Sequence, residues 1–250
     1  MKNKLNGMKK ISLTPITFAL LFAWGGTLLP GSLRAATQPP LVEGEAEAIL
    51  FMKQEEKLAR DVYLKLGEQW RHRTFQNISK AEQSHMDSVD TLIAAYDLED
   101  TTPEEIGEFT IPELQELYDV LLQMGDASLE AALRVGVLVE ETDIIDLERL
   151  LAETENDAIT EVMTRLVNGS YHHWDAFAGS LEQLGVTVEP TLMHFVKDGQ
   201  LRLSWRGEGF KLQQNPRPAD PNGWTDVPDA GPNSATVPLT ESALFFRLKK

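Results

Sequence analysis

The chain has 250 residues, of which 42% are hydrophobic, enough for one packed globular domain of good size and a smaller one. It contains no cysteine, which excludes disulfides, thiolate metal sites, iron-sulfur clusters and cysteine nucleophiles, so any metal must be held by oxygen and nitrogen. The formal net charge is -16, and residues 37–194 alone hold 33 acidic and 10 basic side chains, which favours cations and excludes nucleic acid as an expected partner.

The first 36 residues differ from the rest of the chain. Four lysines in the first ten residues precede an apolar run at 16–29, which is followed by the small pair Ala35 and Ala36. A basic start, a short apolar stretch and a small-residue exit predict a signal peptide over residues 1–36, and hence a periplasmic or extracellular protein. An uncleaved membrane anchor is the alternative.

Residues 43–185 are rich in Glu, Leu and Ala with helical periodicity, so we predict a mainly α protein. Ser79, with Glu82 three residues later, is the expected start of the second long helix. Residues 97–127 form a long connection, in which Pro103 and Pro112 each predict a short helix. Two antiparallel hairpins joined by one long crossover are typical of a ferritin-like four-helix bundle. The four long helices are expected at 43–70, 79–96, 128–152 and 157–184.

Residues 195–250 have short alternating stretches separated by Gly, Pro and Asn, which predict four or five antiparallel strands. The segment resembles a small β module found at the C-termini of many exported bacterial proteins, which implies attachment to the cell envelope, spacing or sorting. Its expected core consists of Trp205, Phe210, Leu212, Trp224, Val227, Phe245 and Phe246.

Each of the four long helices has a polar residue near the middle of its apolar, core-facing stripe. A single buried carboxylate costs several kcal/mol if it stays charged and unpaired, so four such positions at comparable depth favour a metal site in the core. A stripe whose polar groups satisfy one another without metal is the alternative. The residues concerned are Glu56, Glu82 with His85, Glu140, and Ser170 with His173.

Glu82 and His85 form Glu-x-x-His, which places both side chains on one helical face one turn apart. They can therefore coordinate the same ion or two neighbouring ions. Oxygen and nitrogen ligands of this kind can bind iron, manganese or zinc.

The runs "EEKLARDVYLKLGEQW", "FQNISKAEQSHMDSVDTLIAAY", "ALRVGVLVEETDIIDL" and "LVNGSYHHWDAF" resemble the DUF2202 family of the ferritin-like superfamily, over residues 45–185. The resemblance to the superfamily, rubrerythrins included, implies iron as the metal, in one or two ions. The superfamily pattern has one Glu or Glu-x-x-His on each helix. This sequence departs from it in the fourth helix, where Ser170 stands in place of a Glu. Glu141 or Asp143 is expected to substitute for the missing carboxylate. The implied metal ligands are Glu56, Glu82, His85, Glu140 or its neighbour Glu141, and His173.

The expected function is an exported, iron-binding protein that oxidises Fe(II) or reduces oxygen or peroxide, as a di-iron type oxidoreductase. The alternative is a non-catalytic metal-binding or envelope-associated protein whose metal is static or absent. Expected partners are metal ions, an external electron donor because cysteine is absent, the cell envelope, and a second copy of the chain in a homodimer. We expect His172 to point away from the site, and Arg60 and Asp61 to support the ligands or form a surface salt bridge.

Overall fold

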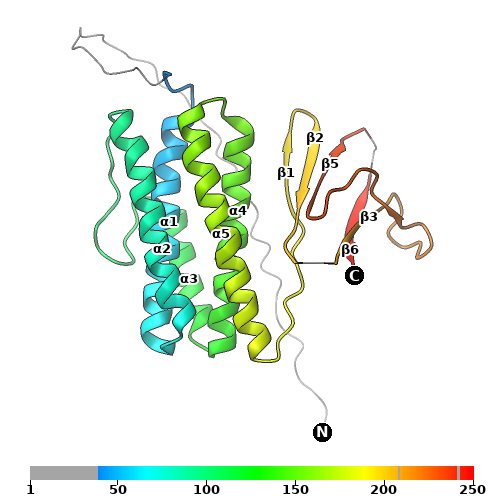
Figure 1. Cartoon of the computed structure of the whole chain (residues 1–250), viewed down its shortest axis with the longest axis horizontal. Coiled ribbons are helices and arrows are strands. Elements are labelled where there is room, and N and C mark those ends of the chain that lie inside the picture. Colours follow the sequence, from blue (N-terminus) through cyan, green and yellow to red (C-terminus); the bar gives the residue numbers. More distant parts are fainter. Residues whose placement is uncertain (1–38, 208, 241–242) are drawn as a thin grey trace. The chain divides into compact units, whose positions relative to one another are not determined.

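The computed structural model describes residues 39–207, 209–240 and 243–250, and these form five α-helices followed by six β-strands (Figure 1). The expected signal peptide, residues 1–36, lies outside the described residues. Within the described ranges no helix is both long and apolar enough to cross a membrane. The helices are α1 (Glu45–Trp70), α2 (Arg73–Ala95), α3 (Pro112–Gly125), α4 (Leu129–Glu153) and α5 (Asp157–Gln183).

Four of these helices are long, and their stripes of apolar residues meet in a single core. The helix α1 packs on α2, and α4 packs on α5, while contacts of α2 with α5 and of α1 with α4 join the two pairs. Short connections follow α1 and α4, so both pairs are antiparallel hairpins (Figure 1). The prediction of a mainly helical chain with a small antiparallel β region at its C-terminus is confirmed.

The helix α2 begins six residues earlier than predicted, at Arg73. Its N-cap is His72, whose ring accepts the backbone N–H of Thr74, whereas Ser79 lies inside the helix and is buried. The reason is tertiary: Phe75 in the first turn is fully buried, with its ring 6.1 Å from that of Tyr63. Burial of a large aromatic ring stabilises this turn without the Ser79 cap that the sequence pattern favoured.

The connection between α2 and α4 contains one helix, α3, and its first half forms turns where a second short helix was predicted. Buried polar groups of α1 hold this first half. Lys57 Nζ donates to Asp61 Oδ2 at 2.6 Å and to the carbonyl oxygens of Glu105 and Glu108 at 2.7 and 3.1 Å. Asp61 Oδ2 also accepts the backbone N–H of Gly107 at 2.9 Å. These bonds satisfy backbone groups that a helix would otherwise have paired internally.

The described residues of the C-terminal region form six strands in two three-stranded antiparallel sheets, ordered β1-β2-β5 and β4-β3-β6, rather than the four or five strands predicted. The strands are β1 (Met193–Lys197), β2 (Gln200–Ser204), β3 (Lys211–Asn215), β4 (Thr225–Asp226), β5 (Ser234–Pro238) and β6 (Phe245–Lys249). Their shared core contains Leu203, Trp205, Leu212, Val227, Ala235 and Val237. Of the predicted core, Phe210 and Phe246 pack at its edge, whereas Phe245 is exposed and Trp224 stacks against Arg247.

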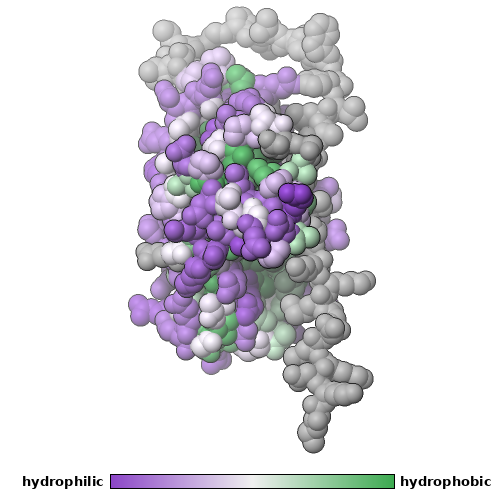
Figure 2. Space-filling view, turned by 90° about the vertical axis from the view of Figure 1, so that its right-hand side faces the viewer, coloured by the Kyte–Doolittle hydropathy of each residue, from purple (hydrophilic) through white to green (hydrophobic). Residues whose placement is uncertain are grey.

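Hydrophilic residues cover most of the face drawn in Figure 2, and hydrophobic residues show in smaller areas between them. This distribution agrees with the high content of charged residues, 25% of the chain. Polar side chains usually lie on the surface, so those that the sequence places at core positions are unusual.

Candidate metal centre

Five side chains from the four long helices meet in the core between these helices. Glu56 comes from the middle of α1, Glu82 and His85 from α2, Glu140 from α4 and His173 from α5. The three carboxylates are each only 1% exposed, and His173 is 9% exposed. Each helix presents these groups on its apolar stripe, since residues three or four apart share one face. All five residues were predicted as ligands from the sequence.

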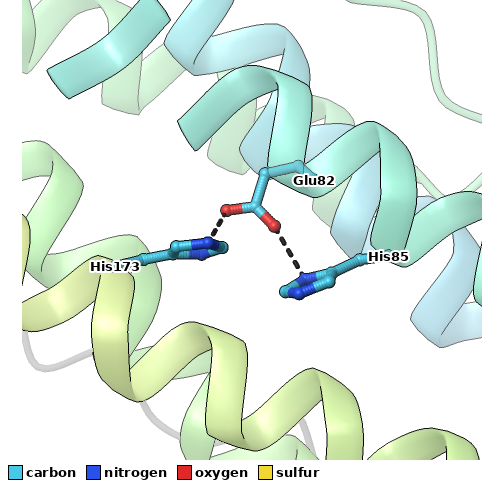
Figure 3. Close-up of side chains that lie close together, drawn as sticks. All are labelled: Glu82, His85 and His173. Carbon is cyan, nitrogen blue, oxygen red and sulfur yellow. Dashed lines mark ion pairs between the residues drawn. The ribbon is translucent and has the colours of Figure 1, made fainter. Parts of the chain in front are cut away.

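Glu82 lies at the centre of this group and contacts both imidazole rings. Its Oε2 is 2.9 Å from Nδ1 of His85, and its Oε1 is 2.9 Å from Nδ1 of His173. Figure 3 shows the Glu82 carboxylate with one oxygen directed to each ring. The two rings stack with centroids 5.2 Å apart. Both Nδ1 atoms face Glu82 (Figure 3).

The other two carboxylates each approach one histidine. Glu56 Oε2 lies 3.1 Å from His85 Nδ1, and Glu140 Oε2 lies 3.5 Å from His173 Nδ1. The group therefore has two halves, Glu56 with His85 and Glu140 with His173, which share the Glu82 carboxylate. A carboxylate with two oxygens can bridge two cations in this arrangement.

Several polar atoms of the group are buried and have no hydrogen-bond partner among the described residues. They include Glu82 Oε1 and His173 Nδ1, although these two atoms are only 2.9 Å apart, and also Glu56 Oε1. The short contact between Glu82 and His173 thus lacks the angles of a hydrogen bond. Buried polar atoms without partners are costly, and a cation held between them would satisfy them. One ligand atom from each of Glu82, His85 and His173 lies within 4.8 Å of the others, a geometry able to hold an ion.

Protons on the two histidines balance part of the negative charge of the carboxylates. Burial alone would raise the pKa of Glu82, but the close contacts and charges of His173 and His85 lower it to about 2. Burial would lower the pKa of both histidines, but the neighbouring carboxylates raise it to about 11 for His85 and about 10 for His173. The two imidazolium rings therefore supply positive charge that a metal ion would replace, since a metal ligand must be a deprotonated imidazole.

Burial also raises the pKa of Glu56 and of Glu140, to about 7 in each case. The histidine paired with each of them opposes this rise. With pKa values near 7, Glu56 and Glu140 are partly protonated at neutral pH, and a bound cation would favour their ionised forms.

Tyr63 supports Glu140 from α1. Its hydroxyl donates to Glu140 Oε1 at 2.6 Å, and its ring is fully buried, 5.0 Å from the ring of Phe177. Burial, followed by the charges of Glu140 and Glu82, raises the pKa of Tyr63 well above its usual value, so the phenol keeps its proton. Tyr63 therefore acts as a hydrogen-bond donor that orients one carboxylate of the centre.

The structure does not bring Glu141 to this group. Its Oε1 accepts a bond from Trp174 Nε1 at 3.2 Å, on a different face of α4 from Glu140. His172 is exposed, as expected for a residue beside His173 that points away from the core. Arg60 donates to Asp61 and Gln83, and Asp61 is fully buried, so the ion pair is not on the surface as one expectation had it but links α1 to α2 through Gln83.

Gly169 is a residue of the site that the sequence analysis did not single out. A Cβ at this position of α5 would lie 2.7 Å from His85 Cε1 and under 3.0 Å from His85 Nε2, a separation that real Cβ atoms do not show. The absence of a side chain therefore makes room for the imidazole ring. Its only signal in the sequence is a glycine in a helix interior, where glycine is unfavourable.

The family model found for this protein matches the five helices and the first strand, β1. DUF2202, described as an uncharacterized protein domain, matches residues 45–197. The uncharacterized protein MJ0754 of Methanocaldococcus jannaschii is 41% identical over 152 residues, which are 60% of this chain and 82% of that protein. The crystal structure of MJ0754 superposes with a TM-score of 0.59 and 40% identity, covering 63% of this chain and 89% of that one. A DUF305 fragment from Deinococcus radiodurans is 14% identical, with a TM-score of 0.44. Because the matched residues are more than half of the chain, this protein belongs to the DUF2202 family.

Proposed function

We propose that the helical domain is a ferritin-like four-helix bundle that binds iron between its four long helices. The observation that carries this proposal is the Glu82 carboxylate, which is shared by the Nδ1 atoms of two histidines at 2.9 Å each. The long connection from α2 to α4 supports the same proposal, because a ferritin-like bundle needs one such crossover.

The donor set fits two ions. Glu56, Glu82 and His85 would hold one ion, and Glu82, Glu140 and His173 would hold a second, with Glu82 common to both. Iron would supply one-electron redox chemistry toward oxygen or peroxide when bound. The protein's own part is to orient the ligands, with Tyr63 donating to Glu140, and to exclude water through burial.

The activity we propose is oxidation of Fe(II) to Fe(III), or reduction of oxygen or peroxide with electrons from an external donor. A donor outside the chain is needed because the chain contains no cysteine for an iron-sulfur or rubredoxin-like site of its own. Residues 1–36 are proposed to export the protein, and N-terminal sequencing of the mature protein tests their cleavage. Attachment to the cell envelope through the C-terminal β region and homodimer formation also remain proposals.

The test is the metal content of the purified protein together with its rate of Fe(II) oxidation in air. We expect His173→Ala and Glu82→Gln to lose bound iron and oxidation, whereas the matched control His172→Ala, one residue away on the exposed face, keeps both. Equal iron binding and oxidation in His173→Ala and the control would contradict the proposal. If the protein binds zinc tightly but consumes neither oxygen nor peroxide, the proposed metal site is supported and the proposed redox activity is refuted.

A further inference from the structure

The proposed centre lacks a carboxylate on α5. On the stripe of α5 that faces the core, the residue one turn before His173 is Ser170, which is 1% exposed. A serine hydroxyl is a weak metal ligand compared with a carboxylate, so α5 offers only one strong donor to the centre. The α2 stripe, with Glu82 and His85 at the same spacing, offers two.

A carboxylate from α4 reaches this position. Ser170 Oγ lies 2.5 Å from Asp143 Oδ2, which makes Asp143 the closest polar contact of the serine. The hydroxyl is also 3.0 Å from the carbonyl oxygen of Leu166, but its single proton can serve one acceptor at a time. Asp143 is three residues after Glu140, so the two carboxylates share one face of α4.

The second oxygen of Asp143 has no hydrogen-bond partner in the part of the chain that the structure describes. Asp143 is 5% exposed, and its Oδ1 forms no hydrogen bond to any described residue. Burial, followed by the charges of Glu56 and Glu140, raises the pKa of Asp143 well above its usual value. Asp143 thus lies beside the core-facing stripe of α5, at the position one turn before His173, with one oxygen anchored by Ser170 and the other without a hydrogen-bond partner among the described residues. A cation is the partner that would satisfy an ionised oxygen in this position.

We propose that Asp143 is a further metal ligand, which supplies from α4 the carboxylate that position 170 of α5 does not carry, with Ser170 as its positioning residue. This inference rests on the proposed metal centre. It extends the donor set to four carboxylates and two histidines, drawn from all four long helices. Asp143 shares a face of α4 with Glu140, so it would join the ion held by Glu82, Glu140 and His173, whereas Glu56, Glu82 and His85 would hold the other ion without it.

The experiment is an anaerobic titration of the full chain with Fe(II), and with Mn(II) as a probe that air does not oxidise, followed by direct metal analysis. We expect two ions per chain for the wild type. Asp143→Asn keeps the shape and the bond with Ser170 but removes the charge, and it should weaken one of the two binding events by about 100-fold or more, since even residues that only support ligands contribute 10- to 100-fold. The matched control is Glu141→Gln, a buried carboxylate of the same helix that bonds to Trp174, and it should bind as the wild type.

The reciprocal variant moves the carboxylate from α4 to α5. In Asp143→Ala/Ser170→Glu the second binding event should return, because a glutamate at position 170 occupies the side of the centre that Asp143 reaches. A folded double variant that still lacks this event contradicts the proposal. Ser170→Ala keeps Asp143 but removes its anchor, so binding should weaken by about tenfold.

Two outcomes separate this inference from the proposed function. A wild-type chain that binds no metal refutes both. A wild-type chain that binds metal, with Asp143→Asn and Ser170→Ala giving titration curves that superpose on it, refutes only the role of Asp143. Circular dichroism of each metal-free variant checks that it is folded before binding is compared.

Discussion

Replacing Gly169 by alanine tests whether the space beside its Cα is what allows the His85 ring to reach Glu56 and Glu82. Helix α5 supplies a matched control, because a Cβ at Gly179 would meet no atom within 4 Å. Alanine is favoured over glycine in a helix interior by about 1 kcal/mol, so Gly179→Ala should raise the free energy of unfolding by about that amount. The same gain applies to Gly169→Ala before any contact is considered.

At Gly169 the new methyl group would overlap the imidazole, with 2.7 Å to His85 Cε1. Overpacking of a core position costs about 1–3 kcal/mol, which cancels or exceeds the gain in helix propensity. Gly169→Ala should therefore range from neutral to about 2 kcal/mol less stable than the wild type, and about 1–3 kcal/mol less stable than Gly179→Ala. Urea unfolding of the metal-free protein measures both values.

The cause is identified by adding His85→Ala. Without the ring, Gly169→Ala should become stabilising, as Gly179→Ala is, so a double-mutant cycle should give a coupling energy of about 1–3 kcal/mol between positions 85 and 169. Gly169→Ala should also bind metal more weakly, because the displaced ring no longer presents Nδ1 to Glu82. If Gly169→Ala stabilises the wild type as much as Gly179→Ala does, the reasoning is refuted.

Two further predictions follow from the charges in the core. Burial would lower the pKa of His85, but the neighbouring carboxylates outweigh burial and raise this pKa to about 11. The folded state therefore keeps a proton on His85 that the unfolded state, with a pKa of 6.5, releases above pH 6.5. The contribution of His85 to the stability of the metal-free protein is therefore complete below pH 6.5 and declines as the pH rises toward 11. Urea midpoints at pH 6, 8 and 9 should fall in the wild type and vary less in His85→Gln; equal slopes would contradict this. Asp61→Ala leaves the fully buried Lys57 without its carboxylate and should cost about 3–5 kcal/mol, whereas Glu130→Ala, in an exposed ion pair, should cost less than about 1 kcal/mol by urea unfolding.

The ligand positions were accessible to sequence reasoning because each helix showed a polar residue on an otherwise apolar stripe. The 3.6-residue period assigns Glu56, Glu82, His85, Glu140 and His173 to core faces, and the structure brings all five together. The same period places Glu141 about 100° from Glu140. It could not decide between Glu141 and Asp143 as the residue near Ser170, because both lie within one turn of Glu140. The hydrogen bond from Ser170 to Asp143 is a contact between α4 and α5, so it depends on how these helices pack.

Local signals were least reliable where a segment is stabilised by distant residues. Ser79 has the spacing of an N-cap, but α2 begins at Arg73 because Phe75 is buried against α1. The α2–α3 connection has a proline that could start a helix, yet bonds from Lys57 and Asp61 hold it as turns. In both cases tertiary contacts outweigh a preference worth about 1 kcal/mol.

The sequence by itself determined the helical class of residues 43–185, the strands of the C-terminal region and the residue types available for metal, since these depend on composition and on periods within one element. The tertiary structure decided which of these groups meet. The sharing of Glu82 between two histidines, the anchoring of Asp143 by Ser170 and the space at Gly169 all involve pairs of helices. Distances between helices are set by the packing of whole side chains, and a periodicity within one helix carries no information about them.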